Sequence, residues 1–168
     1  MAQLSSEDRL EIIELNSRHF YALDGLHRIL RGDPAEHFAN TFTQDGLFEI
    51  RNSDDSIRFS LKGYEQLLSG QQQFPDIEQT RHWIGGLLIE PHEEGARSGS
   101  YIIAMNISVN PSTIIRTGTY DDLIVKKDYH ENIQARYNIG RETVKTLLKN
   151  MKKDHNYLRE KYQMVISK

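Results

Sequence analysis

Asp24 and His82 are the two side chains of this sequence best suited to move a proton. Asp24 closes the run of residues 19–24 and His82 stands within residues 80–83, so each polar group is set among apolar neighbours. An imidazole gains and loses a proton near neutral pH, and a neighbouring carboxylate can hold the ring charged or fix its tautomer. Such a pair suits the transfer of one proton to or from an apolar small molecule.

A helix over the first part of the chain must position Asp24. Ser5, or the serine after it, is a suitable N-cap, and acidic residues follow in the first turn. At about 100° per residue the apolar side chains form one wide arc, and Asp24 falls inside it between Ile13 and Leu10. The sequence therefore predicts a buried carboxylate, which needs a polar partner. The alternative is that Asp24 only ends the helix before Gly25.

The rest of the sequence predicts an α+β fold. A second, short helix has Asp33 as its cap and Pro34 at its first position, and it is expected to run as far as Phe42. A third helix begins near Gly63. Helices followed by consecutive strands indicate that the helices cover one face of a curved antiparallel sheet. The expected strands are 47–51, 57–62, 80–90, 98–110, 113–126 and 132–139.

Composition narrows the classes of protein that remain. A chain of 168 residues fits one domain with room for a pocket. Its net charge of −3 argues against nucleic-acid binding, which needs a clustered basic face. The absence of cysteine excludes disulfides and thiolate catalysis. No signal pattern and no apolar run of about 18 residues is present, so we expect a cytoplasmic protein that does not bind membranes.

A basic segment follows the last expected strand. Residues 141–168 carry eight Lys or Arg against three Asp or Glu, a net charge of +5, which leaves −8 for the rest of the chain. From Val144 to Val165, apolar residues recur at alternating spacings of four and three, with His155 as a polar interruption. This pattern is typical of an amphipathic helix that packs on another surface. We expect a domain over residues 1–140 and a C-terminal helix over 141–168 that packs on it or across a homodimer.

Short motifs follow one another in a fixed order over about residues 10–137. They are Tyr21-Ala22-Leu23-Asp24, Phe42-Thr43-x-Asp45-Gly46, Lys62-Gly63, Arg81-His82, Ala96-x-Ser98, Gly118-x-Tyr120-x-Asp122 and Arg136. In this order they resemble the SnoaL-like branch of the nuclear-transport-factor-2-like superfamily, which includes dehydratases, a dehydrochlorinase and polyketide cyclases. The resemblance implies a cone-shaped pocket between the N-terminal helices and the curved sheet, and chemistry that needs no cofactor.

The resemblance also implies roles for individual residues. Asp24 and His82 occupy the positions of the catalytic pair that several members use. His19 stands where the dehydratases place a tyrosine, and Asn106 stands near the position of a second aspartate in a bile-acid dehydratase. The expected enzyme is a lyase, isomerase or cyclase that moves a proton on an apolar cyclic molecule of polyketide, steroid or terpenoid type. Which member of the pair acts as the base stays open.

Five residues are expected to line the substrate site. Asn106 lies on the smaller, mixed face of its strand, while the opposite, apolar face suits a core or a homodimer interface. Aromatic rings offer a cyclic substrate a surface for stacking. The remaining histidines lack the spacing of metal ligands, so no metal site is expected. The five residues are His19, Tyr21, Trp83, Asn106 and Tyr120.

A non-catalytic module that binds a ligand or a partner chain in the same pocket is the alternative to an enzyme. The basic C-terminal segment favours this alternative. The distance between the Asp24 carboxylate and the His82 ring discriminates between the two interpretations. Hydrogen-bond contact beside a closed cavity supports the enzyme, and a filled or solvent-flooded cone supports the module.

Overall fold

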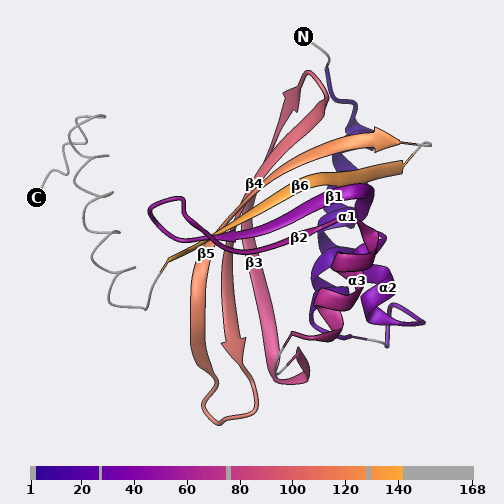
Figure 1. Cartoon of the computed structure of the whole chain (residues 1–168). Coiled ribbons are helices and arrows are strands. Elements are labelled where there is room, and N and C mark those ends of the chain that lie inside the picture. The colour runs from indigo at the N-terminus through magenta and orange to yellow at the C-terminus, as the bar shows by residue number, and fades with distance from the viewer. Residues whose placement is uncertain (1–2, 27, 75–76, 128–129, 142–168) are drawn as a thin grey trace, which may run out of the picture.

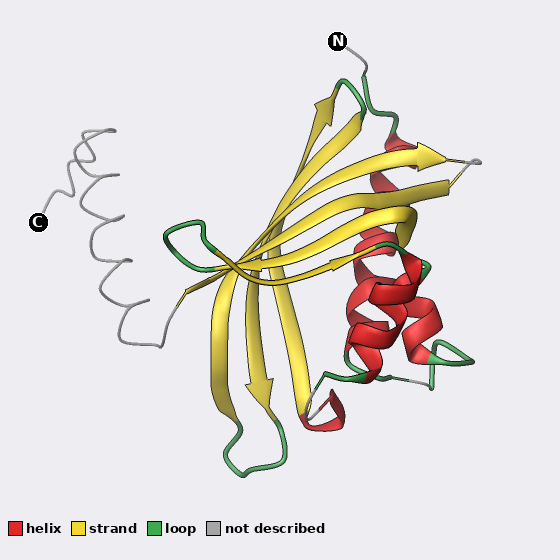
Figure 2. Cartoon of the chain, viewed as in Figure 1, coloured by secondary structure: helices red, strands yellow, loops and turns green. Residues whose placement is uncertain are grey.

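Within the described part of the chain, three helices form one layer and six strands form the other (Figure 1). The computed structural model describes residues 3–26, 28–74, 77–127 and 130–141, with the backbone alone described at 78, 127, 130–132 and 134–141. The helices lie together on one side of the sheet, which bends around them (Figure 2). The helices are α1 (Ser6–Leu23), α2 (Pro34–Ala39) and α3 (Tyr64–Gln72), with a short 3-10 turn at Ile77–Gln79.

The strands form one mixed sheet with the order β2-β1-β6-β5-β4-β3. All neighbours are antiparallel except β1 and β6, which are parallel. The expected α+β fold with helices against a curved sheet is confirmed, and the expectation of a wholly antiparallel sheet is corrected at this one pair. The strands are β1 (Phe42–Arg51), β2 (Ile57–Lys62), β3 (Thr80–His92), β4 (Gly95–Asn106), β5 (Thr113–Lys127) and β6 (His130–Arg141).

The second helix ends earlier than the sequence predicts. It stops at Ala39, and Phe42 already belongs to β1. The Thr41 hydroxyl donates to the Phe38 carbonyl at 2.7 Å, while the Thr41 carbonyl accepts a hydrogen bond from Ile133 N–H at 2.9 Å. The sheet therefore takes up the backbone that the helix would need in order to continue.

Side-chain contacts fix the first turn of α1. Ser5 Oγ accepts from Asp8 N–H at 3.1 Å, and the Asp8 carboxylate accepts from Ser5 N–H at 2.9 Å, which completes a capping box. Lys126 of β5 reaches the same carboxylate at 2.6 Å. This hydrogen bond holds the pKa of Asp8 well below its usual range. The first turn of α1 is thus tied to β5.

Aromatic side chains fill the space between the helices and the sheet. Phe38 is fully buried, and Phe42 and Phe48 are nearly so. Their ring centroids lie 5.4 to 6.3 Å apart in tilted and edge-to-face contacts, the arrangement that aromatic pairs favour. This aromatic cluster belongs to the hydrophobic core, and its member Phe48 also lines the cavity described below.

The expected C-terminal helix over 141–168, and its packing on the domain or across a homodimer, lie outside the described residues. Among the helices that the structure describes, none is both long and apolar enough to span a membrane.

Candidate active site

Asp24 stands at the point where α1 ends, and β3 brings His82 into contact with it. The Asp24 N–H donates to the Phe20 carbonyl at 3.0 Å and so completes the helix, while its side chain extends beyond the last turn. Oδ1 lies 2.5 Å from His82 Nδ1, and Oδ2 accepts from His82 N–H at 3.0 Å. The two side chains are only 5% and 10% exposed. One carboxylate therefore fixes both the backbone and the ring of His82 with little competition from water.

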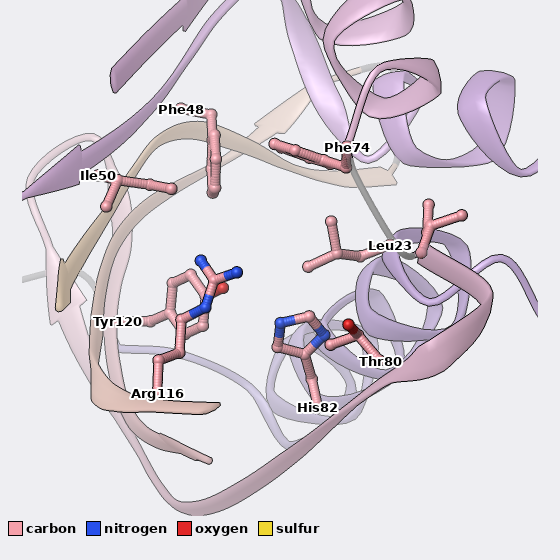
Figure 3. A pocket seen from close by; sticks show the side chains of 9 residues that line it. Leu23, Phe48, Ile50, Phe74, Thr80, His82, Arg116 and Tyr120 are labelled. Atoms are coloured by element: carbon pink, nitrogen blue, oxygen red, sulfur yellow. The ribbon is translucent and has the colours of Figure 1, made fainter. Parts of the chain in front are cut away.

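This contact decides which nitrogen of the ring is available for chemistry. Beside an ionised Asp24, Nδ1 carries the proton and donates it to Oδ1, because a carboxylate only accepts hydrogen bonds. The neutral ring then has its acceptor at Nε2. The nitrogen of His82 that does not contact Asp24 faces a cavity (Figure 3). His82 is consequently arranged to take a proton from a molecule in that cavity, and Asp24 to stabilise the charged ring that results.

The cavity beside His82 lies on the inner face of the sheet and has a volume of about 60 Å³. Most of its wall is apolar, with a few polar groups directed inward (Figure 3), as is usual for small-molecule sites. At about 10–15 Å³ for one water, it has room for a few waters or for a small apolar group. The wall is formed by Leu23, Phe48, Ile50, Phe74, Ile77, Thr80, His82, Arg116 and Tyr120.

A second, wider hollow of about 470 Å³ lies on the other side of the pair. Asp24 lines this hollow together with Tyr21 and Arg81, and the Arg81 guanidinium donates to the Asp24 carbonyl at 3.4 Å. Asp24 and His82 thus contact each other but do not line the same cavity. His82 alone of the pair lines the inner one, with Asp24 behind the ring.

Two of the five expected substrate-site residues line a cavity. Tyr120 is 2% exposed, lines the inner cavity and packs edge-on against Phe20 at a centroid distance of 5.3 Å. Tyr21 lines the outer hollow. Tyr120 therefore lies where a substrate beside His82 would contact it, and Tyr21 lies on the far side of the pair.

His19 lies in the core and lines neither cavity. It is fully buried, its Nδ1 is 3.0 Å from Thr41 Oγ1, and its ring packs against Phe20, Phe38 and Phe42. His19 precedes Asp24 by five residues, which corresponds to a rotation of about 140° around a helix. The two side chains therefore leave α1 in different directions, and His19 points into the aromatic cluster.

Trp83 and Asn106 are also placed away from the inner cavity. Trp83 follows His82 directly on β3. Because successive side chains of a strand point to opposite faces of the sheet, Trp83 lies on the outer face, where the residue is 65% exposed. Asn106 is the last residue of β4. Its Oδ1 accepts hydrogen bonds from Ser108 N–H at 2.8 Å and from the Ser108 hydroxyl at 2.7 Å. This turn also explains why β4 stops at Asn106 instead of at the expected residue 110.

Arg116 is a residue of the cavity that the sequence analysis did not select. It precedes Tyr120 by four residues on β5, so the alternation of strand side chains puts both on the inner face. That alternation is visible in the sequence and was sufficient to find Arg116. In the described part of the chain, no three His, Asp or Glu side chains are grouped as metal ligands.

Comparison with known proteins shows which family this chain resembles. The model of the SnoaL-like domain family matches residues 5–137. A search of curated proteins finds no match. Solved structures share the fold at low sequence identity. One is a protein of unknown function with a cystatin-like fold from Nostoc punctiforme, with 22% identity over 84% of this chain and 97% of that one and a TM-score of 0.68.

Two further solved structures come from Novosphingobium aromaticivorans. The first, a nuclear-transport-factor-2-like protein with a cystatin-like fold, is 16% identical over 79% of this chain and 81% of that one, with a TM-score of 0.65. The second is the β subunit of a putative aromatic-ring-hydroxylating dioxygenase, 15% identical over 84% and 94%, with a TM-score of 0.68. With the family model covering most of its length, the chain belongs to the SnoaL-like domain family, and it shares its fold with the nuclear-transport-factor-2-like protein.

Proposed function

We propose that the protein is an enzyme that removes a proton from a carbon atom of a small apolar molecule, with His82 as the base. The observation that carries this proposal is the 2.5 Å contact between Asp24 Oδ1 and His82 Nδ1 beside an apolar cavity. His82 lines that cavity and Asp24 does not, so the imidazole is the group within reach of a substrate. Asp24 orients the ring and stabilises it when it is charged.

The chemical step follows from this arrangement. The C–H bond of the substrate breaks, and the proton bonds to His82 Nε2. The electron pair moves into a neighbouring carbonyl group or expels a leaving group from the adjacent carbon. Dehydration, double-bond migration and ring closure by a cyclase all begin with this step, and the step itself requires only a base and an electron-accepting group on the substrate. At about 60 Å³, the cavity has room for only a small part of a cyclic substrate.

A binding module is the second candidate function. One structural relative is described as a subunit of a putative dioxygenase, which shows that this fold also occurs as a component of larger assemblies. In that case the Asp24–His82 contact would serve only to join α1 to β3. The two candidates differ in whether the protein accelerates proton exchange at carbon.

Exchange with heavy water tests the proposal without knowledge of the natural substrate. We would incubate the protein in D2O with 2-tetralone and with cyclohex-2-enone and follow deuterium incorporation beside the carbonyl group by NMR. We expect deuterium incorporation at a rate proportional to protein concentration, because each protein molecule supplies one base. The base removes a proton from carbon, exchanges it with D2O and returns a deuteron to the same carbon. Rates equal to those of buffer alone for both ketones would favour the binding module.

We further propose that the outer face of the sheet is covered by a second copy of the chain. Trp83, Tyr101 and Ile103 are 65%, 68% and 38% exposed there, and Trp83 pairs directly with Ile103 across two strands. Leu88 and Ile114 are also exposed. An apolar surface of this kind is typical of an interaction site, and a two-fold axis would pair this face with itself.

Sedimentation equilibrium checks this homodimer. We expect twice the chain mass of 19.5 kDa for the wild type, and the single-chain mass for Trp83→Lys, because the lysine charge would be buried without a partner. Leu10→Lys is the matched control, since Leu10 is equally exposed but lies on α1. A wild type of single-chain mass at micromolar concentration would contradict the homodimer.

A further inference from the structure

We infer that Arg116 recognises a permanently anionic oxygen on the substrate, so that the substrate is an apolar ring compound bearing a carboxylate or a similar acidic group. This inference rests on the proposed function of the His82 cavity and adds the class of molecule that the cavity accepts. Its basis is the place of one cationic side chain in an otherwise mostly apolar wall.

The register of the sheet puts Arg116 and His82 in one row, on either side of a small residue. Ala104 of β4 pairs with His82 on one side and with Arg116 on the other. All three side chains belong to one row on the inner face, with Cα atoms of the outer two about 10 Å apart. The middle residue, Ala104, contributes only a methyl group and is fully buried, while the outer two residues both line the inner cavity.

Arg116 directs a positive charge into that cavity, where no carboxylate of the described residues pairs with it. Its guanidinium group is turned into the cavity (Figure 3). No Asp or Glu lines the cavity, and none of the ion pairs formed within the described residues involves Arg116. The strand arginines Arg51 and Arg97, by contrast, each contact a carboxylate at 2.7 and 2.6 Å. A guanidinium group binds a carboxylate through two parallel hydrogen bonds, and in this cavity a ligand would have to supply the carboxylate.

The exposure of Arg116 indicates which part of the substrate it contacts. The residue is exposed, whereas the His82 side chain is 10% exposed. Arg116 therefore stands at the mouth of the cavity and His82 lies deeper. An acidic group at the mouth keeps part of its hydration, while one edge of an apolar ring lies against Phe48, Ile50 and Phe74 and brings a C–H bond toward His82. This orientation avoids burying the anion, which would be costly.

Matched probes test the inference by binding alone. Benzoate and benzyl alcohol share a ring and differ in charge, and NMR titration of labelled protein gives the dissociation constant of each. We expect the wild type to bind benzoate at least about tenfold more tightly, with shifts at the His82 ring. Arg116→Met should remove this preference and leave benzyl alcohol unchanged. Arg58→Met is the control, because Arg58 is also exposed on a strand, β2, but does not line the cavity.

Several results would overturn the inference. They are equal affinity of the wild type for both probes, unchanged benzoate binding in Arg116→Met, equal weakening of both probes in that variant, and no saturable shift at the cavity. The recognition role of Arg116 and the proposed reaction can be contradicted independently of each other. A protein that selects benzoate through Arg116 but exchanges no carbon-bound proton retains the recognition role and loses the catalytic one, and an active protein without charge preference shows the reverse.

Discussion

Replacing His82 with alanine is expected to lower the rate of proton exchange at carbon by about 10²-fold or more, the usual contribution of a positioned general base. His82 lines the inner cavity and offers it the acceptor nitrogen Nε2, and Asp24 lies behind the ring. Alanine removes the base and leaves the apolar wall in place. The measurement is deuterium incorporation into a ketone that the wild type exchanges.

Asp24→Asn is expected to lower the same rate by a comparable factor for a different reason. The asparagine can keep one acceptor for the His82 N–H, but its amide nitrogen donates toward Nδ1. That contact favours the tautomer with its proton on Nε2, and the nitrogen facing the cavity is then no longer an acceptor. The negative charge that stabilises the protonated ring is also lost. If Asp24→Asn folds normally but loses the reaction, the carboxylate is needed to orient and charge the His82 ring, beyond its contribution to packing.

His92→Ala is the matched control for both substitutions. His92 lies at the other end of β3 from His82, in the turn toward β4, so it shares the strand but not the cavity. We expect its exchange rate to equal that of the wild type. Circular dichroism should show that all three variants fold. If His82→Ala retained more than half of the wild-type rate, another group would have to be the base.

The Asp24–His82 contact was predictable from the sequence because two local patterns converge on it. A polar residue inside an apolar helical arc must find a partner, and the motif order of the family supplied one on a strand. The helix caps at Ser5 and Asp33 were predictable for a similar reason, since the cap depends only on the next few residues. Both caps form as the sequence indicates.

Residues whose position depends on long-range packing were not predictable in this way. Side chains on one apolar arc of a helix can pack against different elements. On α1, His19 packs into the aromatic cluster, whereas Asp24, just after its last turn, contacts β3. The row that joins His82, Ala104 and Arg116 requires the register of three strands, which no single strand encodes. The parallel pairing of β1 with β6 likewise joins segments far apart in the sequence, where no hairpin turn sets the direction.

The largest expected effect on stability concerns the aromatic cluster that supports the cavity. Phe38→Ala should lower the free energy of unfolding by about 3–5 kcal/mol, the usual cost of removing a buried phenylalanine ring. Phe38 is fully buried, and its ring lies 4.9 Å from that of His19 and 6.0 and 6.4 Å from those of Phe48 and Phe74. Urea denaturation of the two proteins measures the difference.

Leu10→Ala is the control for this substitution, because Leu10 is 66% exposed on α1 and its truncation should change stability by no more than about 0.5 kcal/mol. A loss below about 1.5 kcal/mol for Phe38→Ala would show that the cluster is not the centre of the core. The effect should also reach the site. Phe48 and Phe74 both line the cavity and pack against Phe38, so the space left by the ring lets this wall relax away from His82. We therefore expect weaker benzoate binding in Phe38→Ala than in Leu10→Ala, even where both variants are fully folded.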